Sequence, residues 1–169
     1  MVRLRSPILW LVAATVVVVA AWFVVTPRRA WRDFLQALVR DDRATLSVVV
    51  DFPAIREHAD ADLTVALAEQ PKGRQAMPER FRDDLKEQMV NTMASPPGLL
   101  QLVTSFSVPS ASGETARTSF RYRGISRVDV LLGSSRSGEA GLFTFERSRM
   151  HWRLIRATSQ RIAALTPRS

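Results

Sequence analysis

Hydrophobic residues form one unbroken run near the start of the chain and recur at regular intervals after it. The run covers residues 8–25 and contains no charged residue. A helix of this length spans roughly 27 Å, close to the hydrocarbon thickness of a bilayer. Trp10 and Trp22 lie near its two ends, where amphipathic rings favour the headgroup region. The pattern predicts that residues 1–25 are a short cytoplasmic stub and a transmembrane signal anchor in the lipid bilayer.

A cleaved signal peptide is the alternative interpretation of this segment. Val19-Ala20-Ala21 fits a small-residue cleavage site, but the apolar run continues to Val25, beyond a usual signal core. Charge sets the orientation only weakly, because arginines flank both ends of the run: Arg3, Arg5, Arg28, Arg29 and Arg32. A signal anchor near the N-terminus commonly inserts with that end inside. We therefore expect a single-pass protein of the cell inner membrane, with its domain on the periplasmic or extracytoplasmic side.

The next part of the chain has apolar residues at helical spacing. Thr26-Pro27 is a favourable helix start, with a hydroxyl at the N-cap and proline at the first helical position. Asp42 and Asp51 are expected to cap two further helices, and Pro78 and Pro96 to begin two more. The stripe that follows the first start predicts a core-facing helix: Trp31, Phe34, Leu35, Leu38 and Val39.

The hydrophobic period changes to that of strands after residue 115. Four alternating segments at hairpin spacing predict a four-stranded antiparallel sheet with helices on one face. Helices over residues 26–104, followed by strands over residues 115–158, predict a single α+β domain and a tail over residues 159–169. The predicted core takes residues from both halves: Trp31, Phe34, Leu38, Phe52, Ile55, Phe81, Leu85, Phe120, Tyr122, Val128, Phe145 and Trp152.

Composition limits the classes of function. The 169 residues are 46% hydrophobic and 24% charged, which is typical of one globular domain. The absence of cysteine excludes disulfides, a thiol nucleophile and cysteine-ligated zinc. The net charge of +8 is concentrated in residues 117–169, which hold 11 basic and 3 acidic residues. Of the 24 basic residues, 22 are arginine, which binds carboxylate and phosphate groups in bidentate pairs.

Arginines on one strand face are the first candidate site. Arg117, Arg121 and Arg123 project to the same side of a strand, and Arg153 extends this row if the strands pair as hairpins. Such a face attracts carboxylates, phosphates or anionic headgroups, and predicts a non-catalytic module that binds an envelope protein or an anionic ligand. A solvated outer sheet face is the structural alternative. A cytoplasm-facing module that binds nucleic acid or anionic lipid is a further one, although nucleic acid is disfavoured because Phe120 and Tyr122 point away from the arginines.

His58 and Asp62 are the candidate catalytic pair. They are four residues apart and therefore share a helix face, where the pair could serve a hydrolase or isomerase as a base. A solvated helix face is the simpler interpretation, because the sequence supplies no nucleophile or oxyanion donor beside them. No catalytic residue, metal or cofactor is predicted on this interpretation.

Asp51-Phe52-Pro53 and Arg56 form a motif with a predicted structural role. The Asp51 carboxylate can cap the helix that Pro53 begins, and Arg56 can brace it by an ion pair. A functional Asp51–Arg56 pair is the alternative.

The same motif carries a resemblance to a known family. An apolar segment, Thr26-Pro27 and then residues 50–56 (Val-Asp-Phe-Pro-Ala-Ile-Arg) resemble an uncharacterised bacterial family known as domain of unknown function 2939. The helix start at residues 96–100 and the strand patterns at residues 120–130 and 152–154 extend the resemblance over residues 26–158. It implies a small membrane-associated protein without an established activity. The order of elements also resembles the nuclear-transport-factor-like cone fold, which hosts enzymes and binding modules alike.

Overall fold

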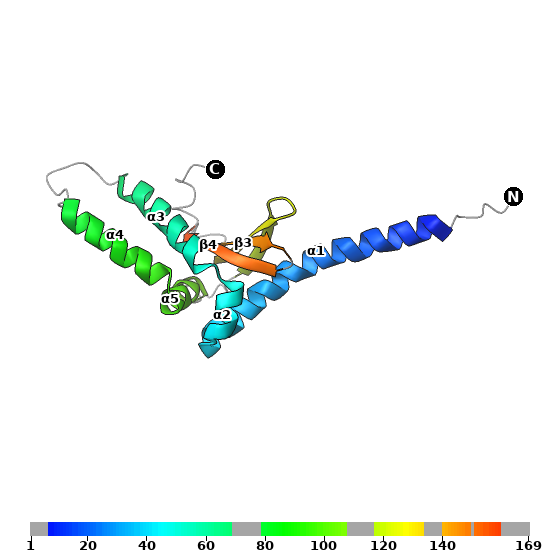
Figure 1. Ribbon diagram of the computed structural model, residues 1–169, viewed down its shortest axis with the longest axis horizontal. Helices are drawn as coiled ribbons and strands as arrows, with labels where there is room; N and C mark the ends of the chain where they lie inside the picture. Colours follow the sequence, from blue (N-terminus) through cyan, green and yellow to red (C-terminus); the bar gives the residue numbers. More distant parts are fainter. Residues whose placement is uncertain (1–6, 69–78, 108–116, 134–139, 150, 160–169) are drawn as a thin grey trace.

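The computed structural model describes residues 7–68, 79–107, 117–133, 140–149 and 151–159. Predicted features at Arg3 and Arg5, at the helix start expected at Pro78 and in the tail after residue 159 lie outside these ranges. The described residues form five helices followed by four strands (Figure 1). The elements are α1 (Pro7–Arg40), α2 (Arg43–Val49), α3 (Phe52–Ala68), α4 (Glu79–Met93), α5 (Pro96–Ser107), β1 (Arg117–Tyr122), β2 (Arg127–Gly133), β3 (Ala140–Ser148) and β4 (His151–Ser159).

The strands form an antiparallel meander in the order β1-β2-β3-β4, which confirms the predicted α+β fold. One face is apolar because alternate residues point to it: Val130 pairs with Phe143, and Phe145 pairs with Leu154. The chain between α2 and α3 runs along the free edge of β4. There Val50 forms a parallel bridge with Leu154, and the Asp51 N–H donates to the Leu154 carbonyl at 2.9 Å.

The second half of α1 packs on this apolar face. Trp31 and Phe34 contact Phe143 and Phe145, with ring centroids 5.1 to 6.2 Å apart. All four rings are buried, at 5% exposure or less. Burial of aromatic rings removes a large apolar area from water, so this cluster is the centre of the core.

Helix α1 is continuous, whereas a new helix was expected to begin at Thr26. Pro27 lies inside it and has no N–H to donate to the carbonyl one turn earlier. The sheet holds the helix on both sides of this position. Trp152 Nε1 donates to Thr26 Oγ1 at 3.0 Å, and the Arg147 guanidinium lies over the Phe23 ring. Residue 26 is therefore no helix boundary. It is the place where one continuous helix passes from its exposed half to the half that packs on the sheet.

The first half of α1 projects away from the domain (Figure 1). Most of its described apolar side chains are exposed, among them Trp10, Leu11, Val12, Val16, Val17 and Val18. Residues 10–39 form a helix long and apolar enough to cross a membrane, with a mean hydropathy of 2.1 over its most apolar window. Only 7% of that window is buried by the rest of the protein, so the domain itself does not cover this apolar surface.

Two residues of the predicted core, and Val39 of the predicted core-facing stripe, are exposed instead, so these predictions were wrong. Phe81 is 57% exposed and Tyr122 is 40% exposed. In α4 the buried residue is Val90, which packs against Ala59 and Leu63 of α3. Neighbouring helix positions differ by about 100° in direction, so the buried face lies one step away from the expected Phe81 stripe.

Candidate functional site

The Asp51 motif joins the end of α2, the start of α3 and the edge strand β4. Asp51 Oδ1 accepts the Ala54 N–H at 3.2 Å at the start of α3, and Asp51 Oδ2 lies 3.1 Å from Arg153 Nη1 of β4. Arg153 Nη2 also donates to the Val50 carbonyl at 3.2 Å. The motif therefore caps α3 and fixes it to the edge of the sheet, and the Arg153 guanidinium is occupied by this junction.

Some arginines of the predicted row hold elements of the fold together, and the others lie exposed on the surface. Arg117 and Arg121 lie exposed on β1, and Arg123 is exposed directly after its end. Arg123 Nε, however, pairs with Asp129 of β2, which is 2% exposed. Asp129 Oδ1 also accepts a hydrogen bond from Thr144 Oγ1 at 2.9 Å. A buried carboxylate needs such partners, so Arg123 serves the sheet here.

Asp62 of the candidate catalytic pair is bound by an arginine of the sheet. Arg156 Nε donates to Asp62 Oδ2 at 3.0 Å, and Arg156 Nη2 donates to Oδ1. The carboxylate is 3% exposed and receives a bidentate pair, which is among the strongest polar contacts in proteins. His58 is half-buried one turn earlier on α3. Within the described ranges, no group of three metal-ligating side chains surrounds these residues.

A hollow of about 730 Å³ lies between the end of α1, α2, the start of α3 and the α4–α5 corner. Its walls are largely apolar, with Leu38, Val39, Leu46, Phe52, Ala94, Pro96, Pro97 and Leu100. Its polar groups are Asp41, Arg43, Arg56, Asn91 and Ser95. We call this space the α1–α5 hollow. A mostly apolar cavity with a few polar groups is typical of small-molecule sites.

Hydrogen bonds fix charged side chains in and beside the α1–α5 hollow. Arg56 Nη2 donates to Asn91 Oδ1 at 2.7 Å, which fixes this guanidinium between α3 and α4. The ion pair expected between Arg56 and Asp51 is replaced by the pair of Asp51 with Arg153. Arg43 is the first residue of α2 and is exposed. Asp42 caps the same helix: Thr45 donates to its carboxylate through the hydroxyl (2.6 Å) and the N–H (3.1 Å). These hydrogen bonds, the hydroxyl one foremost, lower the pKa of Asp42.

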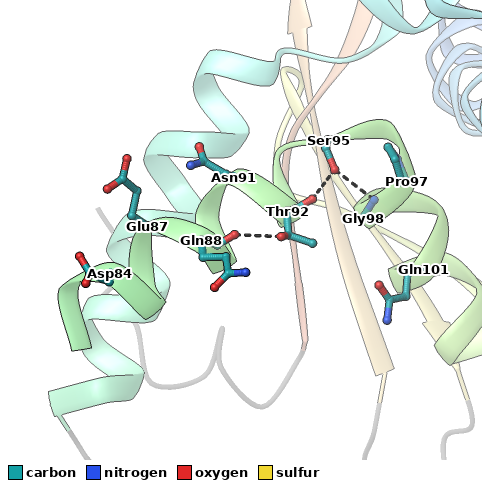
Figure 2. A pocket seen from close by; sticks show the side chains of 9 residues that line it. All are labelled: Asp84, Glu87, Gln88, Asn91, Thr92, Ser95, Pro97, Gly98 and Gln101. Carbon is teal, nitrogen blue, oxygen red and sulfur yellow. Dashed lines mark hydrogen bonds between the residues drawn. The ribbon is translucent and has the colours of Figure 1, made fainter. Parts of the chain in front are cut away.

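A second, open groove of about 670 Å³ runs along α4 and the start of α5 (Figure 2). It is lined by carboxylates and amides, including Asp84, Glu87, Gln88 and Gln101. Ser95 Oγ donates to the Thr92 carbonyl at 2.6 Å and accepts the Gly98 N–H at 3.2 Å (Figure 2). Residue 98 must be glycine, because a Cβ there would lie 1.8 Å from the Thr92 carbonyl oxygen. Ser95 is thus a helix cap at this corner.

Sequence reasoning missed the α1–α5 hollow and the two buried carboxylate pairs. Asp62 and Arg156 are 94 residues apart, so no local pattern relates them. A buried position for Asp129 was foreseeable only in part, because its neighbours Val128 and Val130 mark a core strand. The many arginines in the strands were the sequence signal for these pairs, because each could bind a carboxylate inside the domain.

Comparison with known proteins identifies the family. Neither a curated protein nor a solved structure matches the chain. One family model, described as "Protein of unknown function (DUF2939)", matches residues 16–102, from the apolar half of α1 to α5. The match includes the Asp51 motif and every residue that lines the α1–α5 hollow, whereas the sheet lies beyond it. The chain therefore belongs to the DUF2939 family.

Proposed function

We propose that this protein is a single-pass membrane-anchored module that binds a ligand without catalysis on the extracytoplasmic side. The observation that carries the proposal is the exposed apolar half of α1. It projects from the domain, carries no charge over residues 8–25 and continues directly into the core helix. Exposed apolar surface of this extent is stable in lipid and costly in water.

The α1–α5 hollow is the proposed binding site. Its volume suits a small molecule, and its apolar walls would cover one side of the ligand body, since the hollow is partly open to solvent. Arg56 and Arg43 lie at its polar part, where a carboxylate or phosphate would find a cationic partner. Arg43 Nε lies 3.9 Å from Asp41 Oδ1, an exposed pair that a ligand anion would have to compete with. The favoured ligand class is therefore an amphipathic anion, with an apolar body and one acidic group. Of the arginine row, Arg117 and Arg121 are a second, cationic surface that could bind anions, since Arg123 and Arg153 already hold carboxylates.

A catalytic role for the α1–α5 hollow is not favoured by its chemistry. Ser95 is its hydroxyl group, and Ser95 Oγ is engaged in capping α5. No histidine lines the hollow among the described residues, so a serine–base pair is not formed there. Asp62 of the alternative pair is neutralised by Arg156.

Binding is tested with octanoate, a probe that has an apolar chain and one carboxylate. The chain has no cysteine, so a fluorophore can be placed at a single engineered one. Val39→Cys lies on the hollow and is 78% exposed, and Val48→Cys on α2 is an exposed control outside it. In the reconstituted full chain we expect a saturable response at position 39 and none at position 48. Leu100→Trp, which fills the hollow, should abolish the response. Equal, non-saturating responses at both positions would contradict the proposed site.

The side of the membrane is tested with the same cysteine. In intact cells, Val39→Cys should react with a maleimide that cannot cross the membrane. Labelling only after permeabilisation would place the domain in the cytoplasm and favour the nucleic-acid or inner-leaflet alternative.

A further inference from the structure

One end of the sheet lies beside Trp22 and Phe23, near the end of the apolar half of α1. Arg147, near the end of β3, lies over the rings of Trp22 and Phe23, at 4.4 and 5.1 Å from their centroids. The Arg147 N–H donates to the Ser126 carbonyl of the β1–β2 turn at 2.7 Å. The β1–β2 turn and the end of β3 are therefore next to α1 at Trp22 and Phe23. Figure 1 shows the β1–β2 turn, in yellow, on the side of the domain from which α1 projects.

The residues at this end form a surface that we call the sheet rim: residues 122–127, residues 146–149 and His151. It contains four arginines and one glutamate. Two of the arginines have acidic partners, since Arg123 pairs with Asp129, and Arg127 Nε lies 3.2 Å from Glu146 Oε1. Arg149 is exposed, with a φ of 55°, and forms no ion pair with a described residue. The sheet rim therefore carries an excess of positive charge.

The sheet rim also exposes apolar and aromatic groups. Ile125, at the tip of the β1–β2 turn, is 77% exposed, and Tyr122 beside it is 40% exposed. Trp22 on the adjacent part of α1 is 40% exposed. Arginine, tyrosine and tryptophan beside an exposed apolar residue are the composition that membrane–water interfaces favour.

The orientation of the sheet rim is fixed relative to α1. The helix passes through Pro27 without a break, and Trp152 Nε1 holds Thr26 Oγ1 at 3.0 Å. Arg28 adds a third contact, since its guanidinium lies 5.5 Å from the centroid of the Phe120 ring. A bilayer around the apolar half of α1 would end near Val25, so its surface would meet the sheet rim.

We propose that the sheet rim docks on the bilayer surface and binds the headgroups of acidic phospholipids. The proposal rests on the proposed anchoring by α1 and adds a second, peripheral contact to it. The headgroup phosphates would be bound chiefly by Arg149 and Arg147, and Ile125 would enter the interface. The domain would then stand upright on the membrane, with the α1–α5 hollow at the end of the domain far from the lipid.

Docking is tested with nitroxide labels on the full chain in lipid vesicles. Ile125→Cys reports on the sheet rim, and Val48→Cys on α2 is the matched exposed control. Two vesicle compositions are compared: phosphatidylcholine alone, and phosphatidylcholine with phosphatidylglycerol. We expect the label at 125 to be more accessible to oxygen and less accessible to a nickel chelate than the label at 48. The difference should be larger in the vesicles that contain phosphatidylglycerol.

Charge is tested by Arg149→Asn, which keeps a residue tolerant of positive φ, and by Arg117→Asn at the opposite end of β1. Loss of one arginine near an anionic surface should lower the ratio of docked to undocked chain about fivefold for Arg149→Asn. Arg117→Asn should change little, and circular dichroism should show both variants folded. If the vesicles retain the chain but label 125 behaves as label 48 does, docking is overturned and the anchor stands. Equal effects of the two arginine variants also overturn it. A chain that separates from the vesicles overturns the anchor and the docking together.

Discussion

At the residue scale, the most informative side chain is Asp51. It caps α3 through the Ala54 N–H and pairs with Arg153 of β4, so one carboxylate connects a helix to the sheet edge. Asp51→Ala should lower the free energy of unfolding by about 1–2 kcal/mol, because an N-cap and a half-exposed ion pair are lost together. Asp51→Asn keeps a capping oxygen and should lose less. Chemical denaturation of the full chain in detergent measures both variants, and an equal loss would show that capping contributes nothing.

Asp42 gives a prediction that depends on pH. Hydrogen bonds from Thr45 lower the pKa of Asp42 below the ordinary value of 3.8, so folding favours the charged carboxylate. The stabilisation is therefore complete above the ordinary pKa and is lost as the pH falls through the lower pKa of the folded state. Asp42→Ala lacks this group. The stability difference between the wild type and Asp42→Ala should persist at neutral pH and shrink only in the acid range below the ordinary pKa. A difference that disappears between pH 7 and pH 5 would contradict the assignment.

The core and its exposed counterpart provide a matched pair. Phe34 is fully buried among Trp31, Phe143 and Phe145, whereas Phe81 is 57% exposed on α4. Phe34→Ala should cost about 3–5 kcal/mol through lost burial and a cavity. Phe81→Ala should stay within about 0.5 kcal/mol, as is usual for surface positions. Thermal unfolding in detergent compares the two variants. A large loss of stability for Phe81→Ala would mean that Phe81 is buried, as the sequence pattern had predicted.

At the element scale, local signals were predictable and long-range ones were not. The caps at Asp42 and Asp51 depend on neighbours within three residues, so sequence alone predicted both helix starts. The face of α4 depends on which helix it packs against, and the spacing of Phe81 could not reveal that Val90 meets α3. Thr26-Pro27 has the residues of a helix start, yet contacts with Trp152 and Arg147 keep α1 continuous there.

Candidate site residues follow the same rule. Arg117 and Arg121 are exposed on β1, but Thr118 and Tyr122 on its other face are exposed too, so strand alternation alone does not account for their exposure. The partners of Arg123 and Arg156 come from other elements, and the α1–α5 hollow is built by five helices. A single-sequence pattern contains no information on such packing. The analogy with the cone fold stays a prediction.

The two halves of helix α1 should be separable, because the first half is the proposed anchor and the second half belongs to the core. Its core residues Trp31, Phe34 and Leu38 all follow Thr26, and the projecting half contributes little burial. A chain of residues 26–169 should therefore be soluble and folded, with modest destabilisation from the loss of the Arg147 contacts to Trp22 and Phe23. Circular dichroism and size-exclusion chromatography without detergent test this. An aggregated or unfolded product would show that the projecting half is needed for folding.

At the scale of the whole molecule, one rigid helix links the anchor and the domain. Contacts at Trp22, Phe23 and Thr26 orient the sheet relative to α1, and the α1–α5 hollow opens at the other end of the same helix. This arrangement would present the hollow away from lipid, towards ligands or partners outside the membrane. The family match over residues 16–102 covers part of the projecting half as well as the hollow, so both belong to the shared part of the chain.

Membrane extraction tests the anchoring most directly. Membranes from cells that express the full chain are washed with high salt and then with alkaline carbonate, and the pellet and supernatant are probed for a C-terminal tag, with mass spectrometry of the N-terminus. We predict that the chain stays in the pellet through both washes, retains residues 1–25 and is released only by detergent. The variant of residues 26–169 should appear in the supernatant. Full-length chain, with its first residues intact, in the salt-wash supernatant would contradict the account.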